Sequence, residues 1–163
     1  MPVVDGGMLI STNPASGAEA GRVPVADAEA VTSAVRRARD AAAWWAALGF
    51  DGRKTRLLRW RALLANRVEE LAELTRAESG KPVTEGIMET LGAVEHIDWA
   101  ARNAKRVLGP RRTRTRLVLA EHTGHLEYQP YGVVGVIGPW NYPIFIPLGA
   151  IGSALAAGNG VVF

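Results

Sequence analysis

The chain has 163 residues, of which 48% are hydrophobic and 21% are charged. This composition is typical of a globular protein with a sizeable core and excludes a disordered chain. The net charge of +3 comes from 16 arginines and 3 lysines against 16 acidic residues. The excess is small and scattered, so a nucleic-acid partner is not expected. The sequence contains no cysteine, which excludes disulfides, thiolate metal sites and a cysteine nucleophile within these residues.

Two stretches of the sequence indicate where in the cell the protein is expected. Residues 1–12 lack the basic segment and the long apolar segment that mark a signal peptide. The apolar stretch 144–157 is interrupted by glycine and proline, and a membrane helix needs about 20 apolar residues. We therefore predict a core helix there, no membrane segment and a cytoplasmic protein.

The N-terminal part is predicted to begin with short extended pieces over residues 8–25 around a turn at 13–17. A helix follows, with Asp27 as its N-cap and Gly49 at its end. Its apolar residues recur at helical spacing and predict one buried face: Val31, Val35, Ala38, Ala42 and Trp45.

Two longer helices are predicted next. The first spans residues 53–79 and ends at Gly80, and its expected buried stripe is Leu57, Leu64, Val68, Leu71 and Leu74. The second spans residues 84–108, with Thr84 as a possible cap, acidic residues in its early turns and basic residues in its last turns. Three helices are thus expected before residue 110.

Residues 111–129 change to a strand-like pattern. One strand is predicted from the alternation of Arg116, Val118 and Ala120, with a turn at 122–124 and a return through Leu126 and Tyr128. An isolated hairpin is marginally stable in water. We therefore expect this hairpin to project from the body and to be covered by another subunit or another part of the chain.

Three weak signals favour ordinary structural roles. Residues 80–82 resemble the end of a phosphate-binding loop, but Pro82 stands where that loop needs serine or threonine. His122 and His125 are interpreted as solvated turn residues, because no fuller ligand set with zinc-like spacing is present, and no metal site is predicted. A basic run either binds phosphates or, as we favour, forms a charged edge or interface strand: Arg111, Arg112, Arg114 and Arg116.

The last 31 residues, 133–163, predict a βαβ unit. Residues 133–137 form a short β-branched run that favours a strand buried on both faces, as in a parallel sheet. A helix is expected over residues 147–157, with Gly158 just past its end, and a second strand begins at Val161. Strands average about 5–6 residues, so we expect the 163 residues to be the front part of a longer protein.

Trp140 and Asn141 follow the first strand of this unit and precede its helix. Ligands bind at this position in open α/β sheets, and a helix start favours negative charge. The Asn141 amide could donate to a developing oxyanion. Alternatively, Asn141 only caps the helix and Trp140 only fills the core, and geometry alone does not decide between these interpretations.

A wider pattern resembles the aldehyde dehydrogenase superfamily. It comprises PYGVVGVIGPWNYP at residues 130–143, ALAAGN at 154–159, NPASG at 13–17, VPVAD at 23–27 and ESGKP at 78–82. The resemblance implies an α/β fold, the N-terminal part of the aldehyde dehydrogenase fold. Helices would pack on the start of a parallel cofactor-binding sheet, and a β-hairpin would project from it.

The resemblance also implies roles for individual residues. Family members oxidise aldehydes through a cysteine thiohemiacetal whose oxygen is held by an asparagine, and Asn141 matches that catalytic residue. The segment that lines the NAD or NADP cofactor is matched by Ile137, Gly138, Pro139 and Trp140. The nucleophilic cysteine, the general-base glutamate and further cofactor-binding residues of the family have no counterpart in these residues, so we expect the chain to be catalytically incomplete.

The implied organisation has three parts: residues 1–113 carry N-terminal strands and helices of the cofactor domain, 114–130 the hairpin of an oligomerisation arm, and 131–163 the incomplete βαβ fold. An aldehyde substrate and a homo-oligomer formed through the 114–130 hairpin are expected for the intact enzyme. The alternative is a truncated, non-catalytic paralogue that acts as an oligomerisation or interaction partner.

Overall fold

The computed structural model describes residues 3–114, 116–119 and 121–163. The helices in this part of the chain are α1 (Ala28–Ala47), α2 (Gly49–Asn66), α3 (Val68–Ser79), α4 (Val83–Leu108) and α5 (Phe145–Ala156), with a 3-10 turn at Leu117–Leu119. The strands are β1 (Val3–Asp5), β2 (Met8–Thr12), β3 (Glu19–Pro24), β4 (Arg111–Thr113), β5 (Gly124–Leu126), β6 (Val133–Gly135) and β7 (Gly160–Val162).

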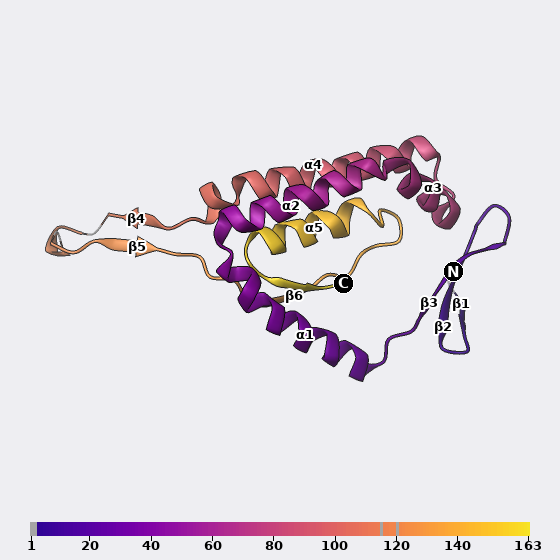
Figure 1. The fold of residues 1–163 in the computed structure, drawn as a ribbon, viewed down its shortest axis with the longest axis horizontal. Helices are drawn as coiled ribbons and strands as arrows, with labels where there is room; N and C mark the ends of the chain where they lie inside the picture. The colour runs from indigo at the N-terminus through magenta and orange to yellow at the C-terminus, as the bar shows by residue number, and fades with distance from the viewer. Residues whose placement is uncertain (1–2, 115, 120) are drawn as a thin grey trace.

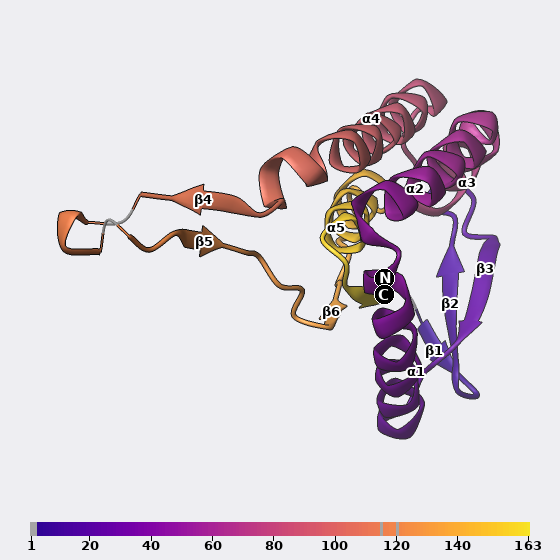
Figure 2. The same ribbon diagram turned by 60° about the vertical axis from the view of Figure 1, so that its left-hand side comes forward.

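The elements form layers around α5 (Figure 1). Helices α2 and α4 pack side by side over α5, and the parallel pair β6–β7 lies between α5 and α1. The antiparallel sheet β1–β2–β3 contacts α3, while the β4–β5 hairpin extends away from the helices in both views (Figure 2). The core lies where α2, α4 and α5 meet and contains Leu57, Ile97, Ala100, Ala101 and Ala156.

Helix α1 begins as predicted, because the Asp27 side chain accepts a hydrogen bond of 2.7 Å from the Ala30 N–H. Its expected apolar face is only partly covered. Ala42 is buried near its C-terminal end, where α1 contacts β6 and β7, but Val31 near its N-terminus is exposed. The helix therefore packs through its second half.

The prediction of one helix over residues 53–79 is wrong, and the structure has four helices, not three, within residues 3–109. The helix breaks at Arg67, whose backbone angles are φ −115° and ψ 19°. The break lets α2 and α3 each pack against α4. It also leaves Leu74, which was expected on the buried stripe, 50% exposed.

A tight turn joins α3 to α4, and the two helices approach each other closely. Gly80 adopts the left-handed conformation that ends α3, as predicted. A Cβ on Gly86 would lie 2.8 Å from the Ala72 Cα atom, so only glycine fits at this contact. Thr84 is not the cap of α4, because the helix already begins at Val83 and Pro82 occupies the N-cap position.

The hairpin exists, but its strands differ from those predicted. Strand β4 pairs antiparallel with β5, and Thr113 lies opposite Gly124, which is a strand residue and not part of the turn. Leu117 and Val118, expected in a strand, lie at a 3-10 turn and are 93% and 94% exposed. Their alternation has no apolar face to pack against, so it does not stabilise a strand. The predicted strand position Ala120 lies outside the described residues.

The βαβ unit is confirmed, with Val134 of β6 beside Val161 of β7 in a parallel pair. Strand β6 is shorter than predicted and is not buried on both faces: it ends at Gly135, which is exposed. In the part of the chain that the structure describes, β7 is its one strand neighbour, so few contacts cover it. None of the described helices is long and apolar enough to cross a membrane.

Candidate functional site

The candidate site is the turn that joins β6 to α5. It begins at the carboxyl end of β6, where the Val136 N–H still donates to the Val162 carbonyl at 2.9 Å. Beyond that bond the chain leaves the sheet, and Ile137 and Trp140 are 97% and 85% exposed. Asn141 is exposed as well. The turn thus presents two large apolar side chains and one amide away from the core.

Both purely structural interpretations of this turn are wrong. Trp140 does not fill the core. Asn141 does not cap α5, because the N-cap residue is Ile144, whose own side chain makes no cap hydrogen bond. The Asn141 amide is therefore not committed to the start of the helix.

Gly138 and Pro139 are both half-buried, and Gly138 packs closely against Pro147 and Phe163. A Cβ on Gly138 would lie 3.2 Å from Pro147 and 3.2 Å from Phe163, which is tighter than ordinary van der Waals contact. The exposed apolar groups of Ile137 and Trp140 lie beside this glycine in sequence. The four residues predicted to line the cofactor therefore lie in one turn, two of them half-buried and two with exposed apolar side chains.

The start of α5 is held by a carboxylate from another helix. Glu89 of α4 accepts hydrogen bonds from the backbone N–H groups of Ile144 at 2.8 Å and Phe145 at 3.1 Å. Its second oxygen lies 3.0 Å from the Lys81 ammonium, which also sits 3.7 Å from the centre of the Tyr142 ring. The negative charge that the helix start favours is therefore supplied by the protein itself.

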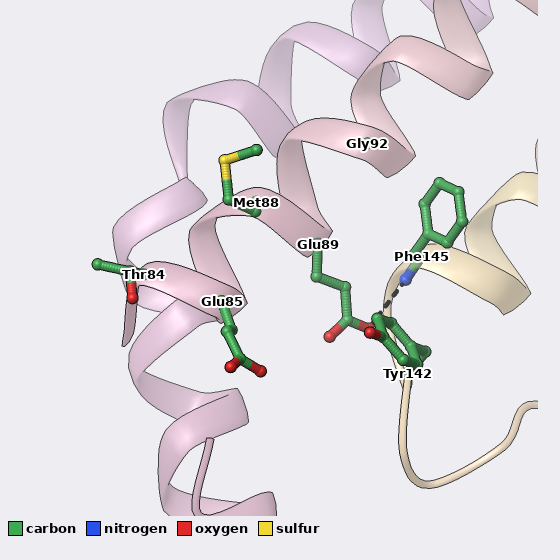
Figure 3. A pocket seen from close by; sticks show the side chains of 7 residues that line it. All are labelled: Thr84, Glu85, Met88, Glu89, Gly92, Tyr142 and Phe145. Carbon is green, nitrogen blue, oxygen red and sulfur yellow. Dashed lines mark hydrogen bonds between the residues drawn. The ribbon is translucent and has the colours of Figure 1, made fainter. Parts of the chain in front are cut away.

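A pocket of about 520 Å³ opens beside this carboxylate. Figure 3 shows the Glu85 and Glu89 side chains on the face of α4 that borders it, with Tyr142 and Phe145 across from them. Thr84, Met88 and Gly92 complete the lining. Tyr142 directly follows Asn141, so the pocket adjoins the turn that carries the candidate amide.

The far end of the βαβ unit is fastened by two buried polar side chains. The Asn159 amide donates to the Ala154 carbonyl at 3.1 Å and accepts from the Gly132 N–H at 3.0 Å, which ties the end of α5 to the residue before β6. Arg53 donates to the Ala156 carbonyl at 3.1 Å. Burial lowers the pKa of the Arg53 guanidinium from its ordinary value, but arginine stays charged at neutral pH.

The sequence interpretation missed the roles of Glu89 and Lys81. Glu89 was expected among the acidic early turns of its helix, and Lys81 was set aside with the incomplete phosphate loop. One signal was available: Glu89 lies three residues after Gly86 and four before Ala93, and both of these are buried on the packed face of α4. A carboxylate on such a face needs a partner.

The remaining candidates are the two histidines and the basic run of the hairpin. Among the described residues, no group of three or more histidine, cysteine, aspartate or glutamate side chains could hold a metal ion. His125 lies opposite Arg112 in the hairpin, and the Arg111 guanidinium lies over the Tyr128 ring at 5.4 Å. The basic run is exposed, and its use in binding stays untested.

The sequence model of the aldehyde dehydrogenase family matches residues 4–163. The chain belongs to the aldehyde dehydrogenase family. It is 37% identical over 158 residues to N-succinylglutamate 5-semialdehyde dehydrogenase of Paraburkholderia xenovorans and 36% identical over 159 residues to that of Chromobacterium violaceum. It spans about a third of these curated relatives (32% of each), and the matches cover 97% and 98% of the chain.

Solved aldehyde dehydrogenases have the same fold over this region. The NADP-dependent glyceraldehyde-3-phosphate dehydrogenase of Bacillus halodurans, complexed with NADP, matches with a TM-score of 0.88 and 30% identity over 97% of this chain and 34% of its own. Succinate-semialdehyde dehydrogenase of Burkholderia pseudomallei gives 0.89 and 31% over 95% of this chain and 32% of its own. The predicted fold class, a mixed α/β part of the aldehyde dehydrogenase fold, is therefore confirmed.

Proposed function

We propose that the chain is the N-terminal portion of an NAD(P)-dependent aldehyde dehydrogenase that oxidises an aldehyde to a carboxylic acid. The observation that carries this proposal is Asn141 in the turn between β6 and α5: it is exposed, does not cap α5, and directly precedes Tyr142, which lines a pocket with Phe145. The family membership of residues 4–163 supports it. Because the sequence contains no cysteine, the nucleophile must come from outside these 163 residues.

In this proposal Asn141 acts on the tetrahedral intermediate that follows attack by that cysteine. Its side-chain N–H donates to the oxygen that gains negative charge, as the donors of an oxyanion hole do. Ile137, Gly138, Pro139 and Trp140 would line the cofactor, which supplies a hydride acceptor when bound. NAD and NADP are both compatible with these residues.

The aldehyde would enter through the pocket beside Tyr142. Its lining combines apolar groups of Met88 and Phe145 with the carboxylate of Glu85, and it adjoins Asn141 in sequence. Which aldehyde reacts depends on residues outside this chain as well. A homo-oligomer joined through residues 114–130 is part of the proposal, and a cytoplasmic location stays a prediction from the N-terminal sequence.

The test is Asn141→Ala in a complete dehydrogenase whose first segment is this chain, such as a fusion to the remaining part of the Paraburkholderia relative. Loss of one oxyanion donor should raise the barrier by about 2.7–4 kcal/mol and lower turnover by roughly a hundred- to a thousandfold. The formation of reduced nicotinamide measures turnover, and cofactor affinity should change little. Asn66→Ala, at an exposed residue that ends α2, is the control. Unchanged turnover in Asn141→Ala would refute the assigned role.

The same proposal predicts that the 163-residue chain alone does not oxidise aldehydes. A purified chain is incubated with NAD or NADP and a panel of aldehydes, and reduced nicotinamide is followed. Without a cysteine no thiohemiacetal can form, so no product above background is expected. Turnover at ordinary enzyme rates, about 1–1,000 per second, would contradict the mechanism.

A second function is favoured by the hairpin. It extends from the helices with Leu117 and Val118 almost fully exposed, while the sequence lacks the family's nucleophile. The chain would then be a non-catalytic partner that joins full-length subunits. Co-purification of the tagged chain with a full-length relative from the same cell supports this function, and a well-folded monomer that captures no relative argues against it.

A further inference from the structure

The segment that follows Asn141 is held by a buried carboxylate. The Glu89 side chain is only 1% exposed, and one of its oxygens accepts from the Ile144 and Phe145 N–H groups. Glu89 and these two residues are 55 and 56 positions apart in the chain. The contact therefore fixes the beginning of α5 relative to α4, which a local cap could not do.

Lys81 closes the arrangement from the other side. Its side chain is 16% exposed, its ammonium lies 3.0 Å from the second Glu89 oxygen, and the same ammonium lies over the Tyr142 ring. Residues 142, 144 and 145 are thus all contacted by one ion pair. Asn141 is the residue immediately before this contacted segment.

We propose that Glu89 and Lys81 form a clamp that positions the Asn141 amide, so that both are positioning residues for the reaction. The inference rests on the proposed function, because it assigns the clamp a role through Asn141. Held at residues 142, 144 and 145, the turn has few ways to move its amide. A displacement of about 1 Å in a catalytic group can cost roughly a hundredfold in rate.

The chemistry of the clamp favours positioning over stability alone. Replacing a buried ion pair with apolar residues of similar volume is often neutral or stabilising, so a stable α4–α5 contact does not require one. Hydrogen bonds to a carboxylate are directional and short. They specify where the start of α5 lies, whereas apolar packing tolerates small shifts.

The first experiment measures amide hydrogen exchange by NMR in the 163-residue chain. In the wild-type chain the Ile144 and Phe145 amides should be protected. Glu89→Gln keeps the size of the side chain but removes its charge, and exchange at both amides should accelerate roughly ten- to a hundredfold. Glu85→Gln is the matched control: it lies one turn earlier on α4 and borders the same pocket, but its carboxylate is exposed. That variant should leave both amides unchanged.

The second experiment measures turnover in the complete dehydrogenase described above. Glu89→Gln should lower kcat by about tenfold or more and leave the KM for the cofactor unchanged. If the clamp acts through Asn141, the double variant Glu89→Gln/Asn141→Ala should be no slower than Asn141→Ala alone. Two losses that multiply would overturn the proposal, because they would mean that Glu89 acts independently of the amide.

The outcomes separate this inference from the proposed function. If Asn141→Ala leaves turnover unchanged, the function assigned to Asn141 is wrong. If Asn141→Ala slows turnover but Glu89→Gln does not, only the clamp is refuted. Unprotected Ile144 and Phe145 amides in the folded wild-type chain also refute it. Should Glu89→Gln lose its helical circular dichroism, Lys81→Met repeats both measurements, and the same acceleration and the same non-additive loss of kcat are expected.

Discussion

Arg53 joins the ends of two helices that are far apart in sequence. Its side chain is nearly buried, with 5% of the residue exposed, and it donates to the Ala46 carbonyl near the end of α1 and to the Ala156 carbonyl at the end of α5. The guanidinium also lies 4.7 Å from the centre of the Phe50 ring. This positive charge near the C-termini of two helices interacts favourably with the negative end of each helix dipole.

We predict that Arg53→Leu destabilises the chain by about 4 kcal/mol. Two hydrogen bonds from a charged donor contribute roughly 1.5 kcal/mol each, and the ring contact adds about 1 kcal/mol. The variant also removes the guanidinium donor from the buried contact at the Ala156 carbonyl and from the part-buried one at the Ala46 carbonyl. Urea unfolding followed by far-ultraviolet circular dichroism measures the loss as a lower midpoint with an unchanged slope. The urea midpoint of Arg53→Lys should lie between those of the wild-type chain and Arg53→Leu, because an ammonium cannot reproduce the planar fork of the guanidinium.

Arg56→Leu is the matched control. Arg56 lies on the same helix, is exposed, and lies over the Trp44 ring at 5.4 Å, so its replacement should change stability by no more than about 0.5 kcal/mol. An Arg53→Leu variant that is no less stable than this control would refute the stabilising role of the guanidinium. Equal effects would mean that the Ala46 and Ala156 carbonyls find other donors.

Two further predictions concern packing and pH. Gly86→Ala should lower the free energy of unfolding by about 1–3 kcal/mol, because the new methyl group meets the Ala72 backbone at 2.8 Å. The control Gly135→Ala, where nothing lies within 4 Å, should be nearly neutral in thermal unfolding. Equal melting temperatures of the two variants would contradict the close contact at Gly86. The hydrogen bond from Arg102 lowers the pKa of Asp98 in the folded chain. The ionised Asp98 therefore stabilises the fold at pH values above its unfolded pKa, near 4. This stabilisation is lost as the pH falls through the lower folded pKa. Asp98→Asn should therefore flatten the acid limb of the stability-versus-pH curve, and an identical limb in both proteins would contradict the assignment.

Local signals in the sequence predicted the ends of several elements correctly. Asp27 caps α1, Gly80 ends α3 in the left-handed conformation, and Gly158 follows α5 with a φ of 100°. Each of these outcomes depends on residues within a few positions of one another. The parallel pairing of β6 with β7 also followed from pattern, because a helix separates two short β-branched runs.

The errors arose where contacts between distant segments decide the structure. The helix breaks at Arg67, which is neither glycine nor proline, so that α2 and α3 can each contact α4. The hairpin strands formed at Arg111–Thr113 and Gly124–Leu126, while Leu117 and Val118 found no face to pack on. Alternation predicts a strand only where one side of it becomes buried.

The sequence by itself determined the family, the βαβ unit and the position of Asn141 after its first strand, because these depend on residue order and short-range conformational preference. Only the tertiary structure decided that Trp140 is exposed, that Asn141 does not cap α5, and that Glu89 does so in its place. Glu89 and Ile144 are 55 residues apart. A carboxylate finds such a partner only when packing of α4 on α5 removes it from water and leaves two helix N–H groups as the acceptable donors.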